Sequence, residues 1–269
     1  MRFRLYIGVL AANLALQSRP AIWPALAVTP DRCTTADQPI NTDRPDVANS
    51  SVVVPVGSLQ SENGVDVIGH AGDHSIDGPD GRLRFGLAPC LEVLVDLPNY
   101  VAASGHTPAT ASGVTDLAPA IKWQISPAPG NFDLSATLGA ALPTGKAALA
   151  GPGLQPYLQF PWSKDLAGGW ELTGMLTFFA YPADPQNKLT TETTLGLARE
   201  LSERLEIFAE YAGDFADQEK SRQTINSGVL WRVTKTQQID MHLGLGLNNN
   251  SPNFTLGFGY SFRIDGLLQ

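Results

Sequence analysis

Ionisable side chains recur at alternate positions of this sequence, within short segments that are otherwise apolar. In an extended segment, residues of one parity share one face, so these side chains would gather on one surface. The candidates are Glu62, Asp66, Arg82, Arg84, Glu92, Asp96, Asp116, Lys122, Asp133, Glu171, Glu192, Glu206, Glu210, Arg232 and Asp240. Eleven are acids and four are bases, so the shared surface would attract cations.

The elements that would position these residues are β-strands. From about residue 58 the chain repeats a pattern of roughly twelve alternating segments, each about ten residues long and bounded by turn-forming residues. The last segment is the clearest: its apolar row is Phe254, Leu256, Phe258, Tyr260 and Phe262. None of the apolar rows includes a charged residue, as contact with lipid would require.

Alternation alone also fits a soluble β-sandwich, but two further features favour a membrane barrel. Short connections, expected at 88–89, 126–130, 164–169, 202–204 and 235–237, alternate with mostly longer ones at 70–81, 102–113, 143–153 and 214–222. Beside the short turns, on the apolar faces, lie the candidates for an aromatic girdle: Trp123, Trp162, Trp170 and Trp231. We therefore predict an all-β fold, a transmembrane antiparallel up-and-down barrel of about twelve strands in a bacterial outer membrane.

The first 27 residues have the pattern of a cleaved export signal. Arg2 and Arg4 precede an apolar stretch from Leu5 to Leu16, and Ala25-Leu26-Ala27 is a small-x-small cleavage site. The alternative is an uncleaved anchor, for which the stretch is too short. The expected organisation is a signal peptide (1–27), an N-terminal periplasmic or plug segment (28–57) and an outer-membrane barrel (58–269).

The two cysteines fall at informative places in this organisation. An even number of strands puts both ends of the barrel in the periplasm, with Cys33 in the N-terminal segment and Cys90 at the first short turn. A disulfide there would tie the segment to the lower rim of the barrel. An oxidising compartment favours this bond over the alternative of two unpaired thiols.

A charged cluster precedes the first strand. Asp43, Arg44 and Asp46 could form a gate or contact a periplasmic partner. The other interpretation, which we slightly prefer at this point, is a turn held by Pro45 with local charge pairing.

Several short stretches resemble one bacterial family. Thr42-Asp43-Arg44-Pro45-Asp46 is similar to its N-terminal signature and Pro55-Val56-Gly57-Ser58-Leu59-Gln60-Ser61-Glu62 to its first strand. Arg84-Phe85-Gly86-Leu87 with Glu92, Asp116-Leu117 with Lys122, and Pro143-Thr144-Gly145 resemble later landmarks. The family is the MetA-pathway of phenol degradation family of outer-membrane transporters. The resemblance implies an outer-membrane barrel and a role in uptake of hydrophobic or aromatic compounds.

Motifs of catalysis are not found in the sequence. It has no G-x-S-x-G, no H-E-x-x-H and no phosphate-binding glycine loop, so we expect no enzyme activity and no cofactor. His70 and His74, with Asp73 and Asp77, are expected in one outer loop as solvated side chains rather than a metal site. No histidine is expected to face outward, which disfavours a lipid-acting barrel enzyme.

The function that fits these expectations is a channel or transporter for an unidentified small solute. An open pore would prefer cations, whereas a filled, ion-paired interior would make a closed structural or interaction barrel. The acidic balance disfavours nucleic acid as a partner. The expected surroundings are the lipid bilayer and lipopolysaccharide, with the barrel-assembly machinery as folding partner.

Overall fold

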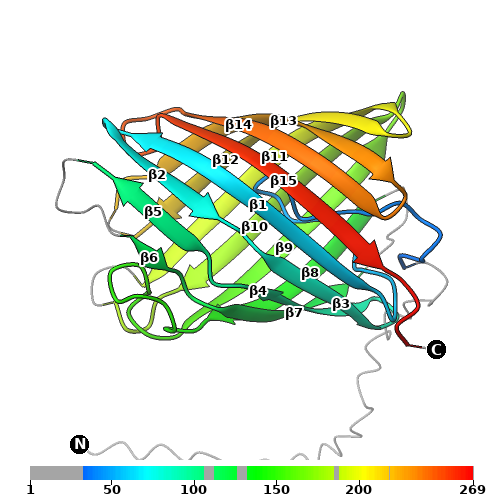
Figure 1. Ribbon diagram of the computed structural model, residues 1–269, viewed down its shortest axis with the longest axis horizontal. Helices are drawn as coiled ribbons and strands as arrows, with labels where there is room; N and C mark the ends of the chain where they lie inside the picture. Colours follow the sequence, from blue (N-terminus) through cyan, green and yellow to red (C-terminus); the bar gives the residue numbers. More distant parts are fainter. Residues whose placement is uncertain (1–32, 106–111, 126–131, 185–187, 218, 269) are drawn as a thin grey trace, which may run out of the picture.

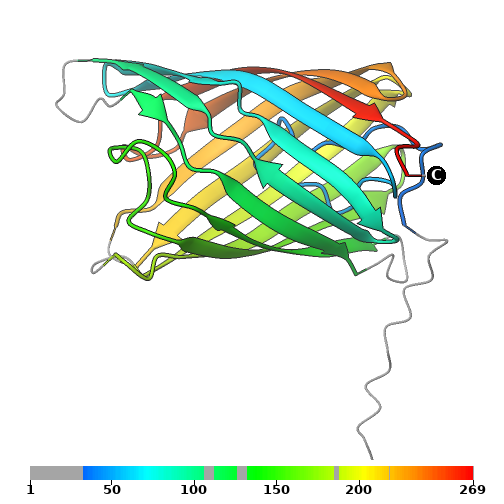
Figure 2. The same cartoon turned by 60° about the horizontal axis from the view of Figure 1, so that its bottom comes forward.

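The computed structural model describes residues 33–105, 112–125, 132–184, 188–217 and 219–268. The signal peptide predicted at 1–27 lies outside this range. The described residues form one antiparallel sheet that closes on itself (Figure 1, Figure 2). Its strand segments are β1 (Leu59–His70), β2 (Asp73–Gly78), β3 (Arg82–Ala88), β4 (Leu91–Asp96), β5 (Tyr100–Ser104), β6 (Gly113–Val114), β7 (Ala118–Gln124), β8 (Phe132–Ala141), β9 (Gln155–Leu166), β10 (Trp170–Ala180), β11 (Leu189–Ser202), β12 (Leu205–Ala216), β13 (Arg222–Thr234), β14 (Gln237–Gly246) and β15 (Phe254–Ile264).

The sheet closes between its first and last strands. β15 pairs with β1 along a register that runs from Leu59↔Ile264 to Gly69↔Phe254. This pairing closes the barrel, so neither β1 nor β15 is left as a sheet edge with unpaired backbone groups.

Fifteen segments make twelve barrel strands because three strands are interrupted partway. β2 and β3 both pair with β1. β2 also pairs with β5, which pairs with β6, and β3 also pairs with β4, which pairs with β7. Two of the interruptions contain Pro79 and Pro98, which have no N–H to donate to a ladder. The prediction of an all-β, up-and-down barrel of about twelve strands is confirmed.

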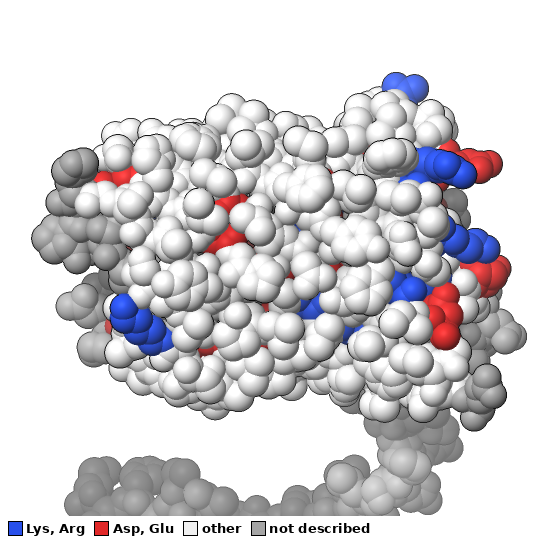
Figure 3. Space-filling view, in the orientation of Figure 1, with Lys and Arg blue, Asp and Glu red and all other residues white. Residues whose placement is uncertain are grey.

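The outer face of the barrel is largely apolar. Residues of the predicted apolar rows, such as Leu195 and Phe258, are each 53% exposed, whereas their strand neighbours are buried or half-buried. Figure 3 shows a broad, mostly uncharged band on this face, with charged side chains gathered mainly towards one end. This arrangement is the one that a hydrocarbon environment requires.

The prediction of a long outer connection at 70–81 is wrong. Ala71 and Gly72, both with positive φ, form a two-residue turn, and β2 follows at once. Such a turn matches the twist of a hairpin, so the chain returns as a strand where a loop was expected. His74 pairs with Gly69 of β1, and its ring lies 6.3 Å from that of Phe254, on the outward face.

Among the described residues, no helix has the length and apolar character needed to cross a membrane.

Candidate functional site in the barrel lumen

The candidate site is the interior of the barrel, which the N-terminal segment crosses. Figures 1 and 2 show this segment, coloured blue, inside the ring of strands. None of the fifteen ionisable residues singled out from the sequence is exposed, and Glu62, Arg84, Glu92, Lys122, Glu210 and Asp240 are almost completely buried. They lie inside because they occupy the parity opposite to the outward apolar rows.

Carboxylates of the wall accept hydrogen bonds from the backbone of the segment. Asp43 N–H donates to Glu62 (2.9 Å), and Val54 N–H donates to Glu92 (2.6 Å). On the opposite side of the bore, Glu210 accepts from the N–H groups of Val47 (2.8 Å) and Ala48 (2.9 Å). Residues 43–54 are therefore attached to both sides of the lumen.

A buried ionic network anchors Asp43. Its carboxylate lies 2.8 Å from Arg82, 3.2 Å from Arg84 and 3.2 Å from Lys122. Burial alone would raise the pKa of Asp43, but the charges of Arg84, Lys122 and Arg82 outweigh it and hold that pKa well below its usual range. Asp43 is therefore ionised throughout the physiological pH range.

Asp46 lies in the opposite electrostatic environment. Burial, and then the neighbouring carboxylate of Glu210, raise the pKa of Asp46 well above its ordinary value. The segment thus carries two carboxylates three residues apart: Asp43 is stabilised as an anion, and Asp46 is not.

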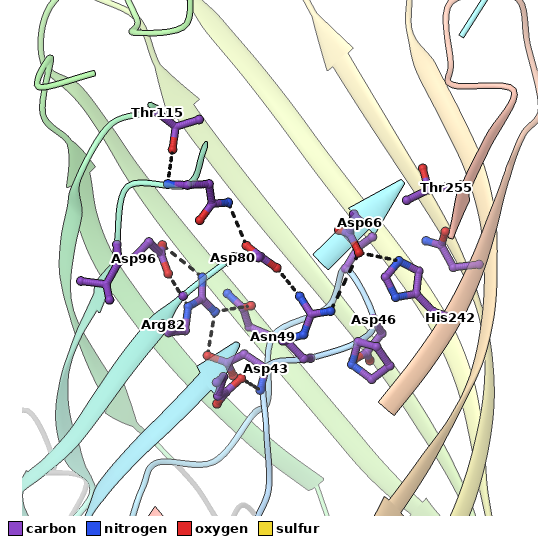
Figure 4. A pocket seen from close by; sticks show the side chains of 18 of the residues that line it. Asp43, Asp46, Asn49, Asp66, Asp80, Arg82, Asp96, Thr115, His242 and Thr255 are labelled. Carbon is purple, nitrogen blue, oxygen red and sulfur yellow. Dashed lines mark hydrogen bonds and ion pairs between the residues drawn. The ribbon is translucent and has the colours of Figure 1, made fainter. Parts of the chain in front are cut away.

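Arg44 lies between these two acids and faces the wall at β1 and β15. Its guanidinium pairs with Asp80, approaches Asp240 to 3.6 Å and Asp66 to 4.0 Å. Figure 4 shows Asp66, Asp80 and His242 from the wall pointing into the same space as Asp43, Asp46 and Asn49 of the segment. The interpretation of a turn with local charge pairing is wrong for this cluster, since Asp43 and Arg44 pair with distant strands that only the barrel brings near.

Two cavities flank the segment. The upper cavity, of about 500 Å³, includes seven carboxylates and two arginines in its lining: Asp43, Asp46, Glu62, Asp66, Asp80, Asp96, Asp116, Arg44 and Arg82. The lower cavity, of about 580 Å³, lies nearer the end that holds the chain termini and is lined by Asp133, Glu171, Glu206 and Arg232, among others. Arg44, Asp46 and Asn49 line both cavities, so they form the constriction between them.

None of the fifteen residues is part of this constriction, and several have contacts elsewhere along the bore. Asp116 holds the loop after β8 by accepting from the N–H groups of Gly145 (2.9 Å) and Gly151 (3.0 Å). Arg232 pairs with Glu206 at 2.8 Å near the lower opening, and Glu192 lies near Asp214 at the other end. Parity placed these residues inside, but it could not give their height along the bore.

Several uncharged lumen residues were left out of the candidate set, although the alternation puts them on the inward rows. Gln60, Gln124, Gln159 and Gln238 are buried inside, and each bonds to the N-terminal segment. Tyr157, Met175 and Phe208 also face inward and are at most 8% exposed. The alternation places all of them on the rows opposite the apolar ones, but a candidate set limited to charged side chains excludes them.

The girdle candidates have the parity of the outward apolar rows and lie on strands near the end with the chain termini. Trp123 and Trp231 are 44% and 51% exposed. Trp162 stacks on Phe132 with ring centroids 6.0 Å apart, and the Arg199 guanidinium lies 4.8 Å from the Trp170 ring.

The two cysteines meet at the same end. Cys33 and Cys90 form a disulfide with their Cα atoms 5.3 Å apart. Cys33 begins the described part of the segment, and Cys90 lies in the turn between β3 and β4, so the segment is tied to the rim before it enters the bore.

The histidines do not form the loop cluster that was expected. His74 and Asp77 are in β2, and His74 faces outward, contrary to the expectation that no histidine would do so. No group of three or more potential metal ligands occurs in the part of the chain that the structure describes.

The closed barrel, its apolar outer face and its polar lumen define an outer-membrane β-barrel of the porin-like type. Residues 42–264 match the model of the family described as "Putative MetA-pathway of phenol degradation". The chain belongs to this family.

Solved structures show the same fold. The COG4313 outer membrane channel from Pseudomonas putida F1 has a TM-score of 0.65 and 20% identity, over 83% of this chain and 100% of that one. The fold is also similar to that of the NanC porin, with a TM-score of 0.53 and 7% identity over 77% of this chain and 100% of that one. For the KdgM porin the TM-score is 0.52 and the identity 8%, over 76% of this chain and 98% of that one. No curated protein sequence matches the chain.

Proposed function

We propose that this protein is a channel for small solutes, narrowed by its own N-terminal segment and selective for cations. The observation that carries the proposal is the pair of acidic cavities that meet at Arg44, Asp46 and Asn49. A low-dielectric wall that encloses excess negative charge concentrates cations and repels anions.

Small aromatic compounds are the class of neutral solute to test first. The name of the family refers to phenol degradation, which supports this class. Each cavity is larger than a single aromatic ring needs, and inward-facing Phe208 lines the lower one.

Insertion by the barrel-assembly machinery and contact with lipopolysaccharide are further expectations for this type of barrel.

The ion-selectivity test is the reversal potential of the refolded mature chain in planar bilayers under a KCl gradient. We expect a potential of the sign that cation flow produces, reduced in Glu171→Gln, which removes a carboxylate from the lower cavity. Glu203→Gln, at an exposed turn, is the matched control and should leave the potential unchanged. A reversal potential of zero in the wild type would contradict the cation preference.

A closed structural barrel is the second candidate, and the bonds of the segment to both sides of the bore favour it. Proteoliposome swelling separates the two candidates. Swelling in small sugars, or swelling in phenol that is faster than in protein-free liposomes, supports the channel. Its absence, together with silent bilayers, supports the closed barrel.

A further inference from the structure

Arg44 occupies a recess in the barrel wall that is floored by glycine. Its guanidinium lies against Gly64 of β1 and Gly259 of β15, which pair with each other. A Cβ at Gly64 would overlap the guanidinium, and one at Gly259 would come within 2.7 Å of Arg44 Nε. The two glycines thus leave a space at the wall in which a planar cation fits.

Carboxylates surround this space. Asp80 hydrogen-bonds to Arg44, whereas Asp240 at 3.6 Å and Asp66 at 4.0 Å are ion-paired but too distant for hydrogen bonds. The Asp240 side chain is completely buried, so its charge has no access to bulk water. Three acids around one guanidinium leave the recess with excess negative charge.

The resident guanidinium leaves much of the recess unsatisfied. Arg44 Nε and Nη2 donate to no described residue, and neither oxygen of Asp240 nor Oδ1 of Asp66 accepts a hydrogen bond from one. A guanidinium offers five donors in a fixed fork, but Arg44 does not place them on all of these acceptors.

The recess can be reached from the lumen. Asp66, Asp80, Arg44 and His242 line the upper cavity, so a small molecule there meets the recess directly. The acidic lining of that cavity would also raise the local concentration of cations.

We propose that this recess is a binding site for small organic cations with a guanidinium, amidinium or primary ammonium head, and that such a cation competes with Arg44 for it. Displacement of Arg44 removes its side chain from the wall at β1 and β15 and widens the constriction, while Asp43 keeps its bond to Glu62 of β1. The widening rests on the proposed channel function, whereas the binding does not.

The experiment is isothermal titration of methylguanidinium chloride, at constant ionic strength, into the full mature chain folded in detergent. Arg44→Ala vacates the recess, so we expect saturable binding at least about tenfold tighter than in the wild type, where Arg44 competes. Adding Asp80→Asn to Arg44→Ala should weaken binding by about tenfold or more, because a charge-assisted hydrogen bond is lost.

The matched control is Asp214→Asn in the Arg44→Ala background, since Asp214 pairs with Arg222 away from the recess and should leave binding unchanged. Absent binding in Arg44→Ala, or binding that Asp80→Asn does not weaken, would overturn the proposal. Binding without bilayer current would retain the recess and refute the channel.

If Arg44→Ala fails to fold, judged by loss of heat-modifiable gel migration, the wild type provides the test. Methylguanidinium added to a sodium chloride bath should increase the sodium current through the wild-type channel, and Asp80→Asn should abolish the increase. In a wild type that conducts sodium before the addition, no increase would overturn the proposal. In a wild type that does not conduct, the channel function fails, and the absence of saturable methylguanidinium binding to the wild type in the titration would overturn the recess.

Discussion

At the scale of single residues, the lumen contains two carboxylates with opposite electrostatic environments. Asp43 contacts Arg82, Arg84 and Lys122, whereas Asp46 faces Glu210. Both acids lie on the same short segment. Their contributions to the stability of the segment inside the barrel therefore depend on pH in opposite directions.

The raised pKa of Asp46 predicts the effect of its removal. A pKa that is higher in the folded state contributes stability at pH values below the ordinary range of the carboxyl, and this contribution is lost as pH rises through the folded value. At neutral pH, Asp46→Asn should therefore increase the free energy of unfolding, on the order of 1 kcal/mol, since one pKa unit corresponds to about 1.4 kcal/mol.

Urea unfolding at pH 5 and pH 8 measures this effect, with the gain expected to be larger at pH 8. The control is Asp37→Asn, an exposed acid of the same segment, which should change little. An equal gain at both pH values would contradict the assignment.

The lowered pKa of Asp43 predicts the opposite behaviour. Its contribution is present above the ordinary range of the carboxyl and is lost only as pH falls through its depressed folded value. Asp43→Asn should cost about 3 kcal/mol or more at neutral pH, because Arg82, Arg84 and Lys122 lose the carboxylate they share, and Glu62 and Glu92 are left to balance Arg84 and Lys122. Urea unfolding measures this loss, and a cost below about 1 kcal/mol would show that the network relaxes around the amide.

At the scale of elements, the N-terminal segment is held at both ends. The Cys33–Cys90 disulfide ties its start to the β3–β4 turn, and Gly57 N–H donates to Gly86 O (2.8 Å) where β1 begins. Between these points the segment crosses the bore, so any movement is confined to the lumen.

Removal of the tether gives a prediction for this element. Cys33→Ala/Cys90→Ala should leave the barrel intact but lower the free energy of unfolding by about 2–4 kcal/mol, the usual contribution of a disulfide. The bilayer current of this variant should fluctuate more, because the segment can leave the bore. Reducing agent should reproduce the effect in the wild type and have no effect on the variant, and a quiet current in both would contradict the role of the tether.

At the scale of the whole molecule, the barrel separates an apolar exterior from a charged interior. Leu195 lies halfway along β11 on the outward face, and Leu201 lies near the end of the same strand. An arginine in mid-bilayer costs about 2–4 kcal/mol, but near the interface the cost is about 0–1 kcal/mol.

Leu195→Arg should therefore reduce folding stability in lipid vesicles by about 2–4 kcal/mol, and Leu201→Arg, the matched control, by at most about 1 kcal/mol. Equal costs for the two variants would contradict the orientation of β11 across the membrane.

The sequence by itself determined which side chains face lipid and which face the lumen, because a strand alternates with period two and lipid excludes charge from one parity. Phe254 to Phe262 and the charged set from Glu62 to Asp240 follow from that rule alone. Only the tertiary structure decided that Asp43 and Arg44 pair with strands far away in sequence, that Gly64 and Gly259 adjoin to form a recess, and that 73–78 is a strand. These features depend on closure of the barrel and on the height of each residue along the bore, which a local pattern of alternation does not contain.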